Sequence, residues 1–223
     1  ISMLVNEILN TEIAPLKESD PVSLALAKLD LLHINKFVVV GHDQKIKGMI
    51  SIETLAEVID ENTELSNLPL EEIISVPISQ HLFETTRQMF AHELYVLPVT
   101  DNENNFLGLV RKREVLNGLG EIFNLSSYGS VITIELAQID YTLSEIVRII
   151  ETESAKILGI AVQQPNDTLN SIRVSIKLNL EDSSVVSAAL RRFGYIIISE
   201  ERSENMENNF SERADELIRY LDI

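Results

Sequence analysis

The sequence predicts a mixed α+β and α/β protein with two βαββα repeats about a pseudo-two-fold axis, a ferredoxin-like domain and a C-terminal helix. The first observation is a duplication: an offset of 60 aligns residues 12–59 with 72–119 without a gap. Self-similarity at a fixed period indicates repeated structural units. The second is a change of hydrophobic pattern near Tyr128, where strand, helix, strand, strand, helix and strand patterns follow one another.

The aligned positions keep their apolar character while the polar residues drift. Matched pairs in the two copies are Val22 with Leu82, Leu29 with Met89, Phe37-Val38-Val39 with Leu97-Pro98-Val99, and Gly48-Met49-Ile50 with Gly108-Leu109-Val110. Conserved apolar spacing with changing polar residues indicates one fold used twice, with two pockets that no longer have the same chemistry.

Each copy has the same order of predicted elements. A short extended piece holding a proline precedes a helix with apolar residues at helical spacing, then two strands around a polar turn, then a second helix. In the first copy these are Pro15, a helix from Val22, strands 36–40 and 46–50, and a helix from Ile52; in the second, Pro77, a helix from Leu82, strands 95–100 and 106–110, and a helix from Lys112.

The remainder of the chain divides into a third domain and a tail. Strands are expected at 131–136, 157–162, 172–180 and 195–198, with helices at 143–150 and near 183–193. The polar tail keeps an apolar helical stripe at Phe210, Ala214, Leu217, Ile218 and Leu221. The predicted domains are therefore 1–60, 61–122, 128–200 and a helical tail at 201–223.

The charge and composition exclude several classes of protein. A formal net charge of -17 would repel the phosphates of nucleic acid and anionic membranes. The chain has no cysteine and no apolar run of the roughly 20 residues that span a bilayer. These features predict a cytoplasmic protein with no nucleic-acid or membrane partner.

The second copy carries the most specific motif. It consists of Met89-Phe90-Ala91-His92-Glu93-Leu94-Tyr95-Val96-Leu97-Pro98-Val99, followed by Gly108-Leu109-Val110. This motif resembles the helix, Leu-Pro-Val strand and glycine turn of the CBS domain. The tandem over residues 1–120 resembles a CBS pair. Residues 128–200 resemble an ACT domain, as in proteins of the acetoin-utilisation regulator type, which join the two modules.

The resemblance implies a cleft for an adenosyl nucleotide in each copy. The family signature is a glycine, an apolar pair, Ser or Thr, two free positions and Asp; the hydroxyl holds phosphate or ribose and the carboxylate accepts the ribose hydroxyls. The first copy has Ser51 but Thr54 at the acid position. The second has Glu114 at the acid position but Arg111 at the hydroxyl position. Neither signature is complete.

Site 2, in the second copy, is the better candidate because Glu114 can bridge a ribose diol and the cations can meet phosphate at a helix N-terminus. Its candidate residues are Ile78, Val96, Leu97, Pro98, Arg111, Lys112, Arg113 and Glu114. Site 1, expected to be weak or empty, would offer Lys17, Phe37, Val38, Ser51 and Thr54. Two alternatives stay open: the basic run faces solvent and pairs with acids, or it binds another anion.

The third domain and the histidines give weaker signals. Where amino-acid-binding ACT domains carry a Pro-Gly-x-Leu turn, this chain has Asp140-Tyr141-Thr142-Leu143, and the tyrosine would block close approach of a ligand. A dimerising or scaffolding sheet is the other interpretation. His33, His42, His81 and His92 are scattered, so no metal site is predicted. No catalytic motif is present, so an enzyme is not predicted.

The sequence therefore predicts a non-enzymatic regulatory module. Its CBS pair would sense AMP, ATP or S-adenosyl-methionine as a regulatory ligand, with no required cofactor. The ACT-like domain would mediate homodimerisation or pass the signal to an unidentified protein partner. The alternatives are a dimerisation scaffold without ligand, or an amino-acid sensor acting through the ACT-like domain.

Overall fold

The computed structural model describes residues 3–163 and 170–202. The chain divides into two compact units, Ile1–Gly120 and Glu121–Ile223, which are described separately. The predicted mixed α/β class is confirmed. Most of the predicted C-terminal helical tail, residues 203–223, lies outside the described residues. The four-part division of the chain stays a prediction.

The first repeat contains β1 (Leu16–Lys17), α1 (Val22–Leu32), β2 (Lys36–Val40), β3 (Ile46–Ser51) and α2 (Ile52–Ala56). Its three-stranded sheet has the order β1-β2-β3. The pairing is parallel between β1 and β2 and antiparallel between β2 and β3.

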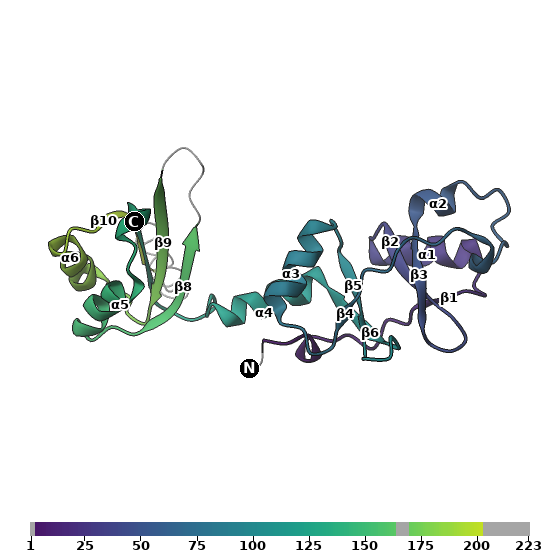
Figure 1. Ribbon diagram of the computed structural model, residues 1–223, viewed down its shortest axis with the longest axis horizontal. Coiled ribbons are helices and arrows are strands. Elements are labelled where there is room, and N and C mark those ends of the chain that lie inside the picture. The colour runs from purple at the N-terminus through teal and green to yellow at the C-terminus, as the bar shows by residue number, and fades with distance from the viewer. Residues whose placement is uncertain (1–2, 164–169, 203–223) are drawn as a thin grey trace, which may run out of the picture. The chain divides into compact units, whose positions relative to one another are not determined.

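The second repeat contains β4 (Val76–Pro77), α3 (Leu82–Ala91), β5 (Val96–Thr100), β6 (Phe106–Arg111) and α4 (Lys112–Ile122). Its sheet has the corresponding order β4-β5-β6 with the same strand directions (Figure 1). Equal order and equal pairing in both copies are the structural counterpart of the ungapped sequence offset.

The segment that precedes each repeat in the chain packs against the other repeat and completes it. A 3-10 turn, η1 (Val5–Glu7), lies against the second repeat, where the Val5 N–H donates to Gln80 O at 2.9 Å. Its counterpart η2 (Leu65–Asn67) lies against the first repeat, where the Leu65 N–H donates to Asp20 O at 3.0 Å. The two repeats therefore exchange their leading segments and form one folding unit.

The repeated glycines are required by this exchange. Leu109, next to Gly108, exchanges two backbone hydrogen bonds of 2.8 Å with Asn10. A Cβ at Gly108 would lie 2.6 Å from Asn10 O, and one at Gly48 would lie 2.6 Å from Leu70 Cβ and 2.9 Å from Glu71 O. Only glycine lets the crossing backbone approach each strand this closely.

The cores of the two repeats interlock through the residue after each glycine. Met49 from the first repeat is buried among Val76, Leu97 and Val110 of the second. Leu109 from the second repeat is buried in the core of the first, as is Val96. This crossing explains why an apolar residue follows the glycine in both copies.

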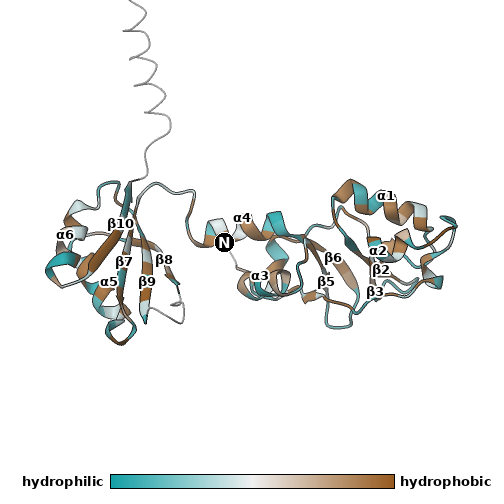
Figure 2. Ribbon diagram, turned by 90° about the horizontal axis from the view of Figure 1, so that it is seen from above, coloured by the Kyte–Doolittle hydropathy of each residue, from teal (hydrophilic) through white to brown (hydrophobic). Residues whose placement is uncertain are grey.

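The second unit is an antiparallel sheet covered by two helices. Its elements are β7 (Ser130–Ala137), η3 (Gln138–Asp140), α5 (Leu143–Thr152), β8 (Ile157–Gln163), β9 (Ser171–Leu178), α6 (Ser184–Arg192) and β10 (Ile196–Arg202). The strand order β10-β7-β9-β8 results when two β-α-β units interleave. Figure 2 shows the hydrophobic stretches of these strands in brown.

The alternation along β7 separates a buried face from an open one. Ile132 and Ile134 are buried with residues of α5 and α6. On the other face, Thr133 Oγ1 lies 2.9 Å from Ser175 Oγ, and an Arg173 nitrogen lies 3.7 Å from Glu135. The sheet thus packs both helices on one face and leaves polar pairs on the other.

Candidate functional site

The candidate site of the second repeat is centred on the junction between β6 and α4. Arg111 is the last residue of β6, and Glu114 lies in the first turn of α4. The Arg111 guanidinium donates a hydrogen bond to Glu114 Oε1, and Arg113 lies 3.8 Å from the same oxygen. The Glu114 side chain is only 19% exposed. The structure therefore brings Arg111, Arg113 and Glu114 together.

This ion pair leaves hydrogen-bonding capacity unused. Arg111 Nε and Glu114 Oε2 are both buried without a hydrogen-bond partner among the described residues. An unsatisfied buried polar atom costs on the order of 1–3 kcal/mol, so such atoms call for an explanation in a native structure. A ligand that donates to Glu114 and accepts from Arg111 would satisfy both atoms.

Lys112 points elsewhere although it is part of the same basic run. Its Nζ lies 5.4 Å from the centre of the Phe90 ring and 5.1 Å from that of Tyr95. These distances are those of cation–π contacts. The three adjacent cations thus divide between a carboxylate and a pair of aromatic rings.

The other predicted residues of site 2 lie along β5. Val96 is the strand partner of Arg111, and the side chains of Val96, Leu97 and Pro98 are buried, so only their backbone could contact a ligand. Ile78 donates its N–H to Thr100 O at 3.1 Å. It therefore lies at the opposite end of β5 from Arg111.

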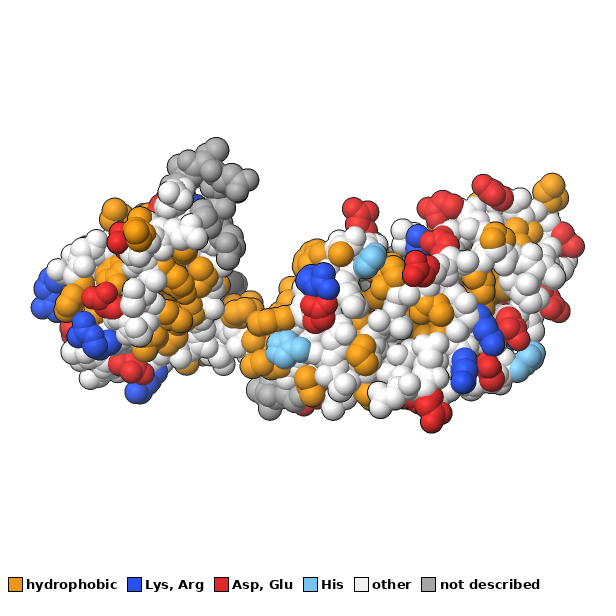
Figure 3. Space-filling view, viewed as in Figure 1, with side chains coloured by type: hydrophobic (Ala, Val, Ile, Leu, Met, Phe, Trp, Pro, Cys, Tyr) orange, Lys and Arg blue, Asp and Glu red, His pale blue; other side chains and the backbone are white. Residues whose placement is uncertain are grey.

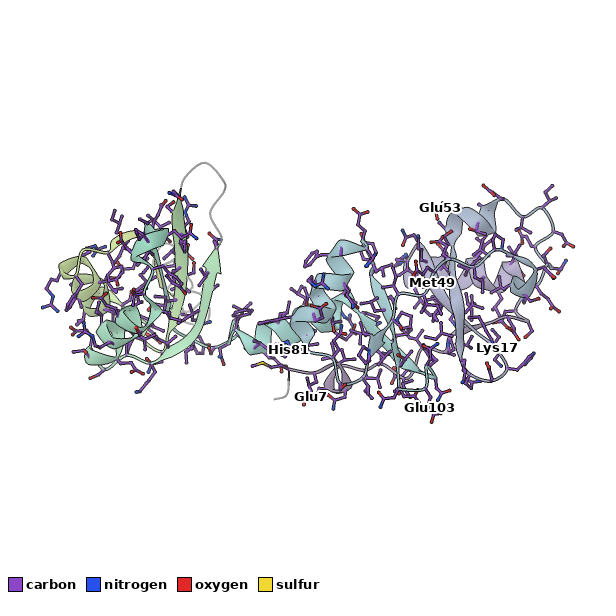
Figure 4. All side chains as sticks on the ribbon, viewed as in Figure 1. Glu7, Lys17, Met49, Glu53, His81 and Glu103 are labelled. Atoms are coloured by element: carbon purple, nitrogen blue, oxygen red, sulfur yellow. The ribbon has the colours of Figure 1, made fainter. Side chains whose placement is uncertain are left out.

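Site 1 has a hydroxyl pair in place of the ion pair. Ser51 caps α2 by accepting a hydrogen bond from the Thr54 N–H at 3.4 Å, and Ser51 Oγ lies 3.0 Å from Thr54 Oγ1. The Phe37 and Val38 side chains are buried. Lys17 pairs with Val40, at the far end of β2 from Ser51; Figure 4 shows Lys17 well apart from Glu53, the neighbour of Thr54.

Two residues that the sequence did not indicate complete the surroundings of Ser51. Lys36 is the strand partner of Ser51, and its Nζ lies 2.5 Å from Glu71 Oε2. The hydrogen bond from Lys36 is the main cause of a lowered Glu71 pKa, and a hydrogen bond from Ser51 adds to it. A carboxylate thus lies beside Ser51 although Thr54 occupies the acid position.

A cavity of about 470 Å³ lies in the second unit, at the turn weighed above as a ligand site. Its lining includes Asp140 and Thr142 of that turn, together with the carboxylates of Glu135 and Glu145 and the ring of Tyr195. Burial is the main cause of a raised Tyr195 pKa. Three carboxylates in the lining disfavour an anionic ligand.

The described residues form neither a metal-binding cluster nor a membrane-spanning helix. Within residues 3–163 and 170–202, no group of three or more His, Asp or Glu side chains could hold a metal ion. No helix in the same part of the chain is long and apolar enough to cross a membrane.

Comparison with known proteins gives a family-model match in the second repeat. The family model described as the CBS domain matches residues 65–121. The match includes β5, β6 and the first turn of α4, so Arg111 and Glu114 lie within it.

One curated relative is an enzyme. Inosine-5'-monophosphate dehydrogenase from Methanocaldococcus jannaschii is 20% identical over 111 residues, which are 50% of this chain. The aligned residues amount to 22% of that enzyme, so this chain spans about a fifth of its length.

Three solved structures are similar over about half of this chain. A CBS domain pair/ACT domain protein from Thermotoga maritima has a TM-score of 0.48 and 21% identity, with 53% of this chain and 98% of that chain covered. The CBS domains of a transcriptional regulator from Streptococcus pneumoniae give 0.47 and 19%, covering 52% and 99%. CBSX2 in complex with AMP gives 0.46 and 18%, covering 54% and 98%.

Proposed function

We propose that this chain is a regulatory module whose first unit binds an adenine nucleotide of the AMP or ATP class beside Glu114. One observation carries the proposal: a largely buried carboxylate with a free oxygen stands at the start of α4, within the segment similar to the CBS domain. A buried carboxylate with a free oxygen can accept hydrogen bonds from a ribose diol.

The proposed binding step is an exchange of partners. The ribose hydroxyls donate to Glu114, and the Arg111 guanidinium turns from Glu114 to the phosphate. Arg113, whose guanidinium lies 3.8 Å from Glu114, supplies a second cation. The N–H groups of the first turn of α4 favour the same anion through the helix dipole. The ligand replaces the ion pair with two charge-assisted contacts.

Site 1 is proposed as a weaker site. Its hydroxyl pair, Ser51 and Thr54, could contact phosphate or ribose, and Glu71 could accept from a ribose. Glu71 is already bound to Lys36 at 2.5 Å, so a ligand has to compete with that contact. Binding at this site therefore needs a higher nucleotide concentration than binding beside Glu114.

The second unit is proposed to relay the signal. Its interleaved β-α-β order supports the resemblance to an ACT domain. In this proposal the unit mediates homodimerisation, and nucleotide binding changes the angle between the two repeats, which a protein partner detects. The proposed function is ligand binding alone, without catalysis.

A scaffold without ligand is the second candidate, and the Arg111–Glu114 pair favours it. The two side chains already neutralise each other in the structure. If the pair never opens, both sites are inactive and only the protein interfaces remain functional.

Thermal unfolding with added ligand separates these candidates. The chain is titrated with AMP, ATP and S-adenosyl-methionine while its melting temperature is followed, because a ligand that binds only the folded state stabilises it. If the chain is a nucleotide sensor, its melting temperature rises with at least one nucleotide. At a ligand concentration 100-fold above Kd, the free energy of unfolding increases by about 2.7 kcal/mol. An unchanged melting temperature with all three would leave the scaffold as the correct account.

A further inference from the structure

Two aromatic side chains hold one cation of the basic run away from site 2. Lys112 follows Arg111 directly and begins α4. Its Nζ lies over the rings of Phe90 and Tyr95, and within the described part of the chain it forms no ion pair. The faces of the two rings, rather than a carboxylate, therefore stabilise the Lys112 ammonium group.

The core of the repeat does not use these rings. Phe90, near the end of α3, is 67% exposed, and Tyr95, just before β5, is 54% exposed. The backbone joins Tyr95 to the start of α4, because the Lys112 N–H donates to Tyr95 O at 2.8 Å. The three side chains thus form a small surface cluster beside site 2, which we call the Lys112 cage.

The first repeat shows that the fold does not require this cage. At the offset of 60, its three positions hold Asp30, Asn35 and Ile52. The backbone contact is the same, because the Ile52 N–H donates to Asn35 O at 2.8 Å. The cage is therefore a feature of the second repeat and not of the first.

With Lys112 in the cage, the remaining charges at site 2 suit one phosphate group. Arg111 and Arg113 both lie against Glu114, so these three side chains together carry +2 - 1 = +1. A phosphate monoester carries about -1.5 to -2 charges at pH 7. Each further phosphate group of a nucleotide adds negative charge that Arg111 and Arg113 do not compensate.

The surroundings of the site penalise such an excess of negative charge. Residues 1–120 contain 18 Asp and Glu against nine Lys and Arg, so their formal charge is -18 + 9 = -9. Figure 3 shows acidic side chains, in red, spread over the visible face of this unit. A surface of like charge lowers the local concentration of an anion. ATP, with three phosphate groups, therefore meets more repulsion here than AMP.

We propose that Phe90 and Tyr95 make site 2 selective for a nucleoside monophosphate over a triphosphate, because their rings hold Lys112 away from the anion. This inference rests on the proposed nucleotide binding beside Glu114. Without the rings, the flexible four-carbon side chain of Lys112 can turn toward the start of α4 and meet a second phosphate group. Phe90 and Tyr95 are thus positioning residues that act through Lys112.

Isothermal titration of AMP and of ATP in the same Mg²⁺-free buffer measures the selectivity. The unmodified chain should bind AMP at least tenfold more tightly than ATP. Phe90→Ala with Tyr95→Asn frees Lys112, so the affinity for ATP should rise at least fivefold while that for AMP changes less than twofold. Adding Lys112→Ala to these two substitutions should remove the gain in ATP affinity.

Phe83→Ala is the matched control for the loss of an exposed ring. Phe83 is on the same helix and is 49% exposed, but its ring packs on His81, with 4.8 Å between the ring centres. This substitution should leave the ratio of the AMP and ATP affinities unchanged. Because all three aromatic side chains are exposed, the variants should keep the melting temperature of the unmodified chain within a few degrees.

NMR spectroscopy tests the cage itself. The ring currents of two aromatic faces should move the Hε protons of Lys112 upfield in the unmodified chain, and Phe90→Ala with Tyr95→Asn should return them to the position of an exposed lysine. The upfield shift should persist when AMP saturates the protein. A shift that AMP abolishes would overturn the proposal, because Lys112 would then leave the rings for the monophosphate.

The outcomes of the titrations separate this inference from the proposed function. Equal or tighter binding of ATP to the unmodified chain, or a gain in ATP affinity that survives Lys112→Ala, overturns the selectivity and leaves nucleotide binding in place. The absence of heat with both nucleotides overturns the proposed function and the selectivity together.

Discussion

Glu114 and Arg111 are the residues on which the proposed function depends, and the structure places both in one ion pair, with Glu114 three residues after Arg111. In the first repeat, an ion pair is formed by residues at other positions of the repeat, Lys36 and Glu71. Each candidate site therefore contains a cation–carboxylate pair, and Arg113 adds a second cation at site 2.

The Lys36–Glu71 pair gives a prediction about pH. The folded chain lowers the Glu71 pKa, so the pair stabilises the fold above the unfolded-state pKa and loses this effect as pH falls through the folded-state value. Because Glu71 is 39% exposed in its side chain, we expect only about 0.5 kcal/mol. Glu71→Gln should thus lower the free energy of unfolding at pH 7 and lower it by less near pH 3.

Urea unfolding at the two pH values checks this prediction. Glu72→Gln is the control, because Glu72 is an exposed neighbour with no ion pair among the described residues. An equal loss of stability at both pH values in Glu71→Gln would show that the carboxylate charge is not responsible.

The sequence indicated the side-chain contacts around Glu114 better than those around Ser51, for a physical reason. Arg111 and Glu114 are three residues apart, a spacing at which side chains around a helix start can meet. Lys36 and Glu71 are 35 residues apart, and Glu71 lies outside the two aligned segments, 12–59 and 72–119. Its position depends on backbone pairing with Met49, which has no side-chain signature.

At the scale of elements, the exchange of leading segments is the feature that the sequence did not reveal. The offset of 60 predicted two equal units, and the strand and helix order agrees with it. The offset could not show that residues 3–10 complete the second repeat, because that contact is made by backbone groups such as those of Asn10 and Leu109.

The two crossing points predict a matched pair of destabilising substitutions. Gly48→Ala and Gly108→Ala should each lower the free energy of unfolding by about 1–3 kcal/mol, because the new Cβ meets the crossing segment at less than 3 Å. Gly120→Ala is the control: it lies in α4 with nothing within 4 Å of its Cβ. The control should be neutral or more stable by up to about 1 kcal/mol, since alanine favours helix.

Equilibrium unfolding in urea measures all three variants under the same conditions. The interpretation of the glycines would be wrong if Gly108→Ala were as stable as Gly120→Ala.

At the scale of the whole molecule, the buried apolar side chains of residues 3–163 and 170–202 form three clusters, two in the first unit and one in the second. The clusters of the two repeats share residues, whereas the described residues in the cluster of the second unit all follow Tyr128. In the sequence, the hydrophobic periodicity changes near Tyr128. The sequence could not predict the interlocking of the repeats, because Met49 and Leu109 appear in sequence as ordinary strand residues.

Separate cores predict two transitions in scanning calorimetry. Ile134→Ala removes a fully buried side chain of the second unit and should lower the melting temperature of one transition only, at a cost of about 2–5 kcal/mol. Leu97→Ala, also fully buried, should lower the other transition by a similar amount. If either substitution shifts both transitions equally, the units do not unfold independently.

The central claim is that Glu114 and Arg111 bind the nucleotide, and isothermal titration of AMP into three proteins tests it most directly. They are the unmodified chain, Arg111→Ala with Glu114→Ala, and Arg87→Ala with Glu84→Ala as the control. The control removes an Arg–Glu pair of the same i, i+3 spacing on α3 of the same repeat. The account predicts binding heat in the unmodified chain and the control, and at least a tenfold weaker affinity without Arg111 and Glu114. Equal affinity in all three proteins, or no heat in the unmodified chain, would contradict it.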